Sequence, residues 1–398
     1  MHSRRSLSGL SAAALLLVTA FPSRAQQQQP PAQSERDGQE VEKVNVEEVR
    51  VPVFAADEHG NFDPTLERDD VLVLEDDVPQ EVRSVVRVPA SILLLLGTGG
   101  ELNPAVRTST TRDIALQLVS RLREGDRIAL AQFNSNVQRL QDWTEDKRAV
   151  LHTLRTKLSA GRGSRLSKAV VEASAYFETQ PVGNRHLVLI TDGVEVPGRL
   201  SYQEAIKVLG AETPEARAQA AEAVRRLNAA QATVHVISYT SIGRKALEVA
   251  EKRDKSDVVG AVQSRADMAT VGIDPTRPPG MRGSGINAPS VGVGVRFDPQ
   301  MRKLRKAYER ETKRSEQRLL SLAEETGGRV WLPITADEMV AAGGHVAREI
   351  GSQYVITYRP KRPLADSQPN EYRRLRVAPR RVGLTLRARR GYVVAAMR

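Results

Sequence analysis

The sequence predicts an α/β fold in which a mostly parallel sheet carries helices on both faces and is inserted into a small β domain. Two strongly apolar runs, within Ile92–Leu96 and His186–Asp192, are typical of strands buried on both faces. Helical periodicity alternates with further strand-like runs around them, which indicates a parallel sheet. Residues 41–88 and 351–398 are rich in β-formers instead, and neither stretch supplies enough strands for a stable sheet alone.

The chain begins with the pattern of a signal peptide over residues 1–25. A basic start precedes the apolar stretch Leu10–Phe21, which is shorter than the roughly 20 residues that a membrane span needs. Ser23-Arg24-Ala25 is a small-x-small cleavage site before Gln26. We therefore expect cleavage between Ala25 and Gln26, export to the periplasm or the extracellular space, and no membrane span afterwards.

A Gln/Pro-rich stretch over residues 26–40 follows and is expected to be a disordered linker. Residues 41–88 form an N-terminal β module, and residues 351–398 form a C-terminal β segment. The expected strands of the two regions are Val44–Val53, Val71–Glu75, Glu81–Val88, Tyr354–Tyr358, Tyr372–Pro379 and Gly383–Arg390.

Opposite charges favour pairing of these two chain ends. Residues 34–81 hold 16 acidic and 4 basic residues, a net charge of −12, whereas residues 359–390 hold 11 basic and 2 acidic residues, a net of +9. Oppositely charged side chains on neighbouring strands stabilise a sheet. We therefore expect the two ends to form one β domain.

The central region, residues 89–350, alternates strands and helices. Its expected strands are Ile92–Leu96, Asp126–Phe133, Val137–Gln141, His186–Asp192, Thr233–Tyr239 and Arg329–Leu332. Its expected helices are a segment carrying Ile114, Leu118, Val119 and Leu122 on one face, then Thr144–Leu158, Leu166–Phe177, Thr213–Ala230 and a last helix opened by the capping box Thr335–Glu338. Residues 244–316 interrupt this rhythm with Pro and Gly, so we expect an insertion that is disordered in its middle and ends in a basic helix, about Pro299–Glu325.

Composition excludes several classes of site. The 398 residues include no cysteine, so disulfides, thiolate metal sites and cysteine nucleophiles are impossible. The six histidines are too scattered for a HExxH zinc helix. Aromatic residues make up only 4% of the chain, which argues against a base-stacking surface and hence against nucleic acid, despite the net charge of +11.

Six stretches of the chain carry a resemblance to a known family, namely Val51–Asp57, Asn61–Val85, Ser91–Leu102, Gly161–Ala169, Leu187–Gly193 and Glu371–Val394. Together they resemble the secreted bacterial proteins with a von Willebrand factor A domain that are known mainly from acidobacteria. The resemblance covers about residues 44–240 and 320–395. It implies a Rossmann-like A domain and export, and no catalytic activity is established for this family.

The resemblance also implies a metal-ion-dependent adhesion site, built from a DxSxS loop, a Thr and an Asp. Such oxygen ligands suit Mg²⁺. Here Gly97 stands in place of the Asp, and Gly99 and Glu101 stand in place of the two Ser; Ser164 replaces the Thr, and Asp192 is retained. We therefore expect a degenerate site without metal or other cofactor, and Mg²⁺ bound through Glu101, Ser164 and Asp192 is the alternative.

Other chemistries find little support in the sequence. Gly97-x-Gly99 begins a dinucleotide fingerprint, but Leu102 replaces its last Gly, and neither a Walker loop nor a Gly-x-Ser-x-Gly elbow occurs. A triad of Ser164, His186 and Asp192 fails because Asp192 follows His186 by six residues on one strand, which places them about 20 Å apart. The sequence therefore indicates a protein that is not an enzyme.

The interpretation is an exported, metal-independent module that binds an unknown protein partner. The rim expected to contact that partner consists of Thr98, Glu101, Ser164 and Asp192. Two alternatives stay open, namely the metal-dependent adhesion module and a basic patch that binds an anionic envelope polymer or nucleic acid.

Overall fold

The computed structural model describes residues 47–394 apart from 100–103, 197, 199–201, 211–212, 247 and 249–298. The chain divides into two units, Met1–Asn45 and Val46–Arg398, and all described residues belong to the second. The expected signal peptide, the linker, Glu101 and the centre of the insertion lie outside the described residues. None of the described helices is long and apolar enough to cross a membrane.

A six-stranded sheet forms the centre of the α/β region, in the order β6-β5-β4-β7-β8-β9. Its strands are β4 (Ser91–Gly97), β5 (Arg127–Phe133), β6 (Val137–Thr144), β7 (Arg185–Thr191), β8 (Ala232–Ser238) and β9 (Val330–Trp331). All neighbours are parallel except β6, which pairs antiparallel with β5. Every residue of β4, β7 and β8 is buried, as expected for strands covered on both faces.

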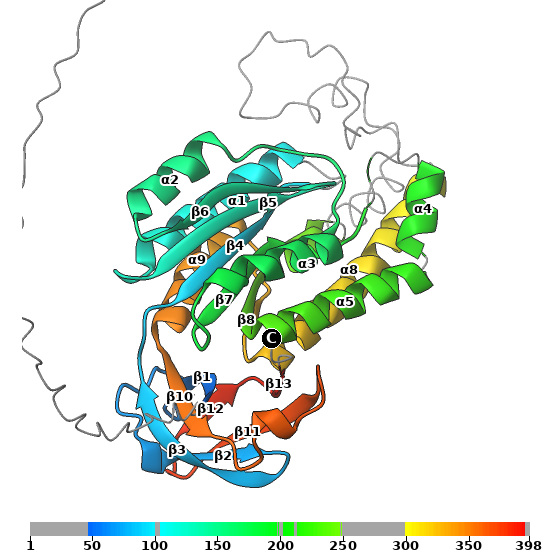
Figure 1. Ribbon diagram of the computed structural model, residues 1–398. Helices are drawn as coiled ribbons and strands as arrows, with labels where there is room; N and C mark the ends of the chain where they lie inside the picture. Colours follow the sequence, from blue (N-terminus) through cyan, green and yellow to red (C-terminus); the bar gives the residue numbers. More distant parts are fainter. Residues whose placement is uncertain are drawn as a thin grey trace, which may run out of the picture. The chain divides into compact units, whose positions relative to one another are not determined.

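Helices cover both faces of this sheet (Figure 1). One face carries α1 (Pro104–Arg121), α2 (Lys147–Thr156) and α9 (Ala336–Gly351), and the other carries α3 (Leu166–Tyr176), α5 (Pro214–Ala230) and α8 (Pro299–Thr326). A further helix, α4 (Tyr202–Gly210), packs beside α8 and was not expected from the sequence. The predicted caps are correct, since the hydroxyls of Thr213 and Thr335 accept N–H groups of the first turns of α5 and α9.

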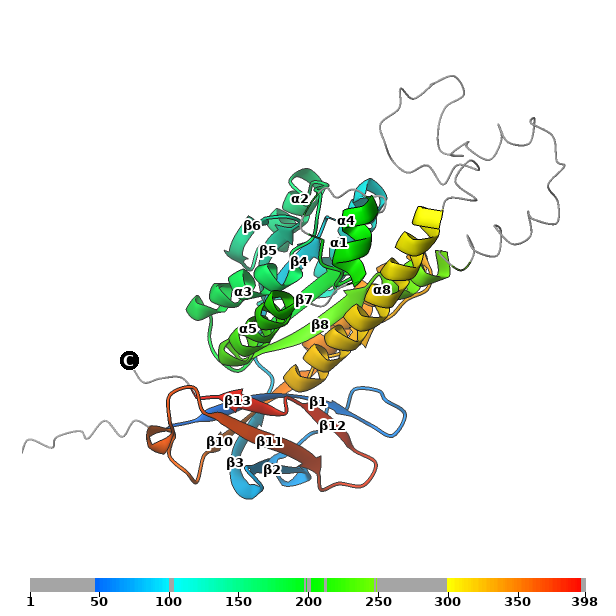
Figure 2. The ribbon, with the colours of Figure 1, turned by 90° about the vertical axis from the view of Figure 1, so that its right-hand side faces the viewer.

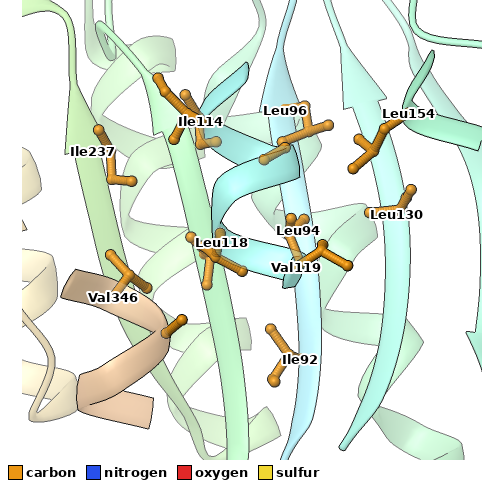
Figure 3. Packing of buried hydrophobic residues seen from close by; sticks show 14 of the residues in the cluster. Ile92, Leu94, Leu96, Ile114, Leu118, Val119, Leu130, Leu154, Ile237 and Val346 are labelled. Atoms are coloured by element: carbon orange, nitrogen blue, oxygen red, sulfur yellow. The ribbon is translucent and has the colours of Figure 1, made fainter. Parts of the chain in front are cut away.

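Alternate residues of each buried strand supply the two halves of the core. Ile92, Leu94 and Leu96 of β4 face α1 and α9, where they meet Ile114, Leu118 and Val346 (Figure 3). Leu93 and Leu95 face the opposite side, toward α3 and α8. The period of two along a strand therefore builds two separate hydrophobic layers from one apolar run.

The second sheet is antiparallel and has seven strands in the order β12-β1-β10-β3-β2-β11-β13 (Figure 2). Its strands are β1 (Val49–Ala56), β2 (Val71–Glu75), β3 (Val78–Val86), β10 (Gln353–Arg359), β11 (Tyr372–Pro379), β12 (Thr385–Ala388) and β13 (Gly391–Val393). Strands from the two chain ends are interleaved in it, so β10 lies between β1 and β3, and β11 pairs with β2. The predicted fold class, an α/β domain inserted into a β domain that both ends build, is confirmed.

The expected attraction between the chain ends takes the form of specific ion pairs. Arg374 lies 3.1 Å from Asp77, and Arg381 lies 3.3 Å from Asp70. Asp76 and Asp77 occupy the β2–β3 turn with positive φ angles of 47° and 68°, a conformation that Asp tolerates better than most residues.

A buried polar network ties this β sheet together at Glu75. One of its carboxylate oxygens accepts a hydrogen bond from Arg373 at 2.7 Å, and the other accepts the hydroxyls of Tyr358 and Tyr392. Arg373 is fully buried and also donates to the carbonyls of Arg362 and Pro363 at 2.8 and 2.7 Å. Strands β2, β10, β11 and β13 thus meet at one satisfied ion pair.

The end of the expected insertion is corrected by the structure. The expected insertion covers residues 244–316 and ends in a basic helix at about Pro299–Glu325. The helix is confirmed as α8, but Ala307, Thr312 and Ser315 within it are fully buried. Ala307, with Leu304 and Tyr308, packs in a cluster with Val194, Val196 and Leu209. This part of the chain belongs to the packed domain, because its buried face follows a helical period that the abundance of Lys and Arg hides in the sequence.

Candidate functional site

The candidate site lies at the carboxyl ends of β4 and β7. The chain leaves β4 toward β5 on one side, whereas β7 lies on its other side. Ligand sites of open α/β sheets lie at such a reversal of strand order. Three loops meet here, namely the glycine loop 97–99, the loop 159–165 before α3 and the loop 192–196 after β7.

The glycine loop packs directly against the loop 159–165. The carbonyl of Thr98 accepts the N–H of Gly161 at 3.1 Å, and its own N–H donates to Phe133 at 3.0 Å. A Cβ atom placed on Gly99 would lie 1.7 Å from the carbonyl oxygen of Gly163. Glycine at position 99 is therefore required for this close backbone approach.

Ser164 connects the second loop to the third. Its N–H and carbonyl form a two-way bridge with Val196, at 2.7 and 2.8 Å. In the same loop, Glu195 accepts the N–H of Ser167 at 2.8 Å and so caps the first turn of α3. The sequence analysis did not identify Glu195, because a carboxylate that caps a helix nearly 30 residues upstream leaves no local spacing signal.

Asp192 is held by the helix α8. Its carboxylate accepts the N–H of Val194 at 3.1 Å and the hydroxyl of Tyr308 at 3.2 Å. The hydroxyl of Ser315 donates to the backbone carbonyl of Asp192 at 2.6 Å. Tyr308 and Ser315 are thus site residues that the sequence analysis missed, since it placed them in the insertion.

The structure brings three of the four predicted rim residues onto adjoining loops. Thr98, Ser164 and Asp192 are all buried, with exposed fractions of 0%, 5% and 4%. Their side chains are therefore buried within the loop cluster, whereas the neighbouring Asn136, Arg162 and Arg165 are exposed. Contact of the four predicted rim residues with a partner stays a prediction, and Glu101 lies outside the described residues.

The oxygen donors of the described part of this site do not complete the ligand set of a Mg²⁺ ion. Mg²⁺ requires near-octahedral oxygen ligands, but Gly97 and Gly99 offer no side-chain oxygen, and the carboxylate of Asp192 already accepts two hydrogen bonds. In the part of the chain that the structure describes, no three His, Asp or Glu side chains gather as metal ligands. Whether the full site is free of metal and cofactor stays a prediction.

Polar side chains also connect the end of β8 to α8. The hydroxyl of Thr240 accepts a hydrogen bond from the hydroxyl of Ser238 at 3.0 Å and donates one to the carboxylate of Glu316 at 2.9 Å. Arg244 forms an ion pair with the same carboxylate. The helix α8 is therefore bound at the ends of both β7 and β8.

Two buried histidines lie on the same strands, His186 near the amino end of β7 and His235 in the middle of β8. Nε2 of His186 is 2.8 Å from the amide oxygen of Asn184, whose nitrogen donates to Val88. Nε2 therefore carries the proton, and Nδ1 of His186 accepts from Nε2 of His235 at 3.2 Å. This arrangement needs the His186 ring to be neutral, and burial lowers the pKa of both histidines.

Acidification is expected to destabilise the protein through His186. Burial lowers its pKa from 6.5 to about 3, so below pH 6.5 the unfolded chain binds a proton that the folded chain refuses. The contribution of neutral His186 to the free energy of unfolding is therefore fully present above pH 6.5, and it is lost as the pH falls toward 3. Between pH 7 and 5.5 the wild type should lose about 1 kcal/mol more than His186→Gln in urea denaturation.

The matched control is His345→Gln, because His345 is exposed. This variant should keep the pH dependence of the wild type. Equal pH slopes for wild type and His186→Gln would contradict the neutral buried pair.

Comparison with known proteins identifies the type of domain. Residues 96–195 match the family model of the von Willebrand factor type A domain. That match includes the carboxyl end of β4, all of β7, Ser164 and Asp192, and it covers about a quarter of the chain. A search of curated proteins found no match.

Several solved structures are similar in part. The von Willebrand factor domain of the type V pili tip protein Mfa5 from Porphyromonas gingivalis is 20% identical, with a TM-score of 0.25 over 28% of this chain and 40% of that one. The conserved hypothetical protein BatB from Bacteroides thetaiotaomicron is 18% identical, with a TM-score of 0.26 over 37% and 66%. A von Willebrand factor type A protein from Catenulispora acidiphila is 11% identical, with a TM-score of 0.39 over 84% and 74%. The chain thus spans less than half of the Mfa5 domain structure.

Proposed function

We propose that this protein is an exported, non-enzymatic module of the von Willebrand factor A type that binds a protein partner without a metal ion. The proposal includes membership of the secreted bacterial group that the sequence resembles and a location in the periplasm or outside the cell. The family match over residues 96–195 supports the interaction role. The observation that carries metal independence is the engagement of Asp192 by Tyr308 and Val194.

A cation at Asp192 would compete with Tyr308 for the same carboxylate oxygen. Tyr308 belongs to α8, which Ser315 also attaches to residue 192, so this competition would act on the helix. The glycine loop adds no compensating ligand at positions 97 and 99. The tyrosine hydroxyl, which can donate one hydrogen bond, satisfies the carboxylate in place of a metal.

Calorimetry with Mg²⁺ and Mn²⁺ tests metal independence. We expect no binding heat at millimolar concentrations and no change in melting temperature. Tyr308→Phe keeps the ring but removes the hydroxyl, so it should lower the free energy of unfolding by about 1 kcal/mol. A Mg²⁺-dependent rise in melting temperature that disappears in Asp192→Ala would refute the proposal.

Photo-crosslinking tests the interaction itself. A crosslinking amino acid at Asn136 or Arg162 lies on the exposed edge of the loop cluster, whereas Arg148 and Arg155 on α2 serve as exposed controls. In cells we expect adducts of defined mass from the first pair only, and they should persist in a metal chelator. Adducts that vanish with the chelator would support the metal-dependent alternative instead.

A further inference from the structure

The outer face of α8 carries a continuous row of positive charge. Lys303, Lys306, Arg310 and Lys313 are all exposed, and they are spaced three, four and three residues apart. Residues at this spacing lie on one face of a helix, and ten residues at about 1.5 Å each give a row roughly 15 Å long. We call these four residues the α8 basic stripe.

Most of this charge is not neutralised. Lys313 lies 2.9 Å from Glu309. In the part of the chain that the structure describes, Lys303, Lys306 and Arg310 take part in no ion pair. Two other cations of the helix, Arg314 and Arg318, pair with Glu311 instead. Like charges three or four residues apart destabilise a helix, so the stripe is not explained by the stability of α8.

The opposite face of α8 holds the stripe in place. Tyr308 and Ser315 bind Asp192, and Glu316 binds Thr240. The positions of the four cations are therefore set before any partner arrives. Preorganisation of this kind reduces the conformational entropy that binding costs.

The chemistry of the stripe selects among possible ligands. It contains no aromatic or aliphatic side chain, whereas insertion into a bilayer and stacking on bases both need them. A convex helix face cannot enclose a small molecule. Three of its four cations are lysines. A lysine ammonium acts as a point charge and does not form the paired hydrogen bonds by which arginine recognises a carboxylate or phosphate.

We propose that the α8 basic stripe binds an acidic helix of a partner protein. Acidic side chains with the same spacing of three, four and three residues would face all four cations at once. This inference rests on the proposed interaction function and adds the chemistry of the partner.

The test uses a synthetic helical peptide with glutamates at that spacing and fluorescence anisotropy on the full-length chain. Lys306→Glu with Arg310→Glu should weaken binding about tenfold or more at about 50 mM salt. The matched control, Arg148→Glu with Arg155→Glu, changes the net charge equally on exposed positions of α2. It should weaken binding less than about threefold. Circular dichroism checks that both variants are folded.

Three outcomes would overturn the inference. These are equal losses in the two double variants, no binding by the wild type, or stripe-dependent binding that is tighter to duplex DNA or to phosphatidylglycerol vesicles than to the peptide. The stripe inference can fail while the proposed function stands. In that case the crosslinked adducts at Asn136 and Arg162 would persist in the double variant Lys306→Glu with Arg310→Glu.

Discussion

Replacing Arg373 by methionine is expected to lower the free energy of unfolding by about 3–5 kcal/mol. The substitution keeps most of the side-chain volume but leaves the carboxylate of Glu75 as an uncompensated charge, since Glu75 is only 3% exposed. It also removes the donors to the carbonyls of Arg362 and Pro363. Because β11 and β2 come from opposite chain ends, the loss should fall on the β sheet that both ends build.

The neighbouring residue provides the control. Arg374 pairs with Asp77 at a similar distance, 3.1 Å, but both side chains are 70% exposed. Arg374→Met should cost no more than about 1 kcal/mol, as exposed ion pairs contribute little. Urea denaturation measures both values, and Arg373→Met combined with Glu75→Leu should recover part of the loss. Equal effects of Arg373→Met and Arg374→Met would show that the buried pair does not hold the sheet.

Gly99→Ser is expected to destabilise the protein by about 2–4 kcal/mol and to create no Mg²⁺ site. Serine is the residue that an adhesion-site loop has at this position, so the substitution looks like a repair. However, its Cβ would lie 1.7 Å from the carbonyl oxygen of Gly163 and 2.9 Å from the Cβ of Asn134. The loop 159–165 would have to move, and that would break its hydrogen bonds to Thr98 and Val196.

Gly243→Ser is the matched control, because a Cβ atom there meets nothing within 4 Å. Thermal and urea denaturation should show a change below about 0.5 kcal/mol for this variant. If Gly99→Ser costs as little, the two loops do not pack as closely as the structure indicates. If it also binds Mg²⁺ in calorimetry, metal independence reflects the missing side chain alone.

The accuracy of the sequence analysis differs between elements for physical reasons. The strand predicted at Ile92–Leu96 is confirmed as part of β4, because a short apolar run is typical of a strand that helices cover on both faces. The N-caps Thr213 and Thr335 were correct because a cap depends on the first helical turn alone. The helix α4 was missed because it is short and packs mainly against α8. The many basic residues of α8 hid its buried face in the sequence.

The candidate site was predicted only in part. The resemblance to an A domain grouped the loops that contain Gly97, Ser164 and Asp192, and backbone hydrogen bonds do bring these loops together. Tyr308 was not found, as it is 116 residues from Asp192 and belongs to no local pattern. The close contact of Gly99 with Gly163 was likewise hidden, because the sequence shows a glycine but not the backbone that approaches it.

The sequence by itself therefore determined the α/β class, most strands and helices, the helix caps, and the pairing of an acidic with a basic chain end. These features follow from periodicity, capping and net charge, which act within a few residues or over a whole segment. The tertiary structure alone decided that Tyr308 satisfies Asp192, that Gly99 closes the glycine loop, and that Arg373 and Glu75 form a buried pair. Each of these contacts joins residues that are far apart in the sequence. Such a contact forms only when the whole domain packs, and the residues next to it along the chain do not indicate it.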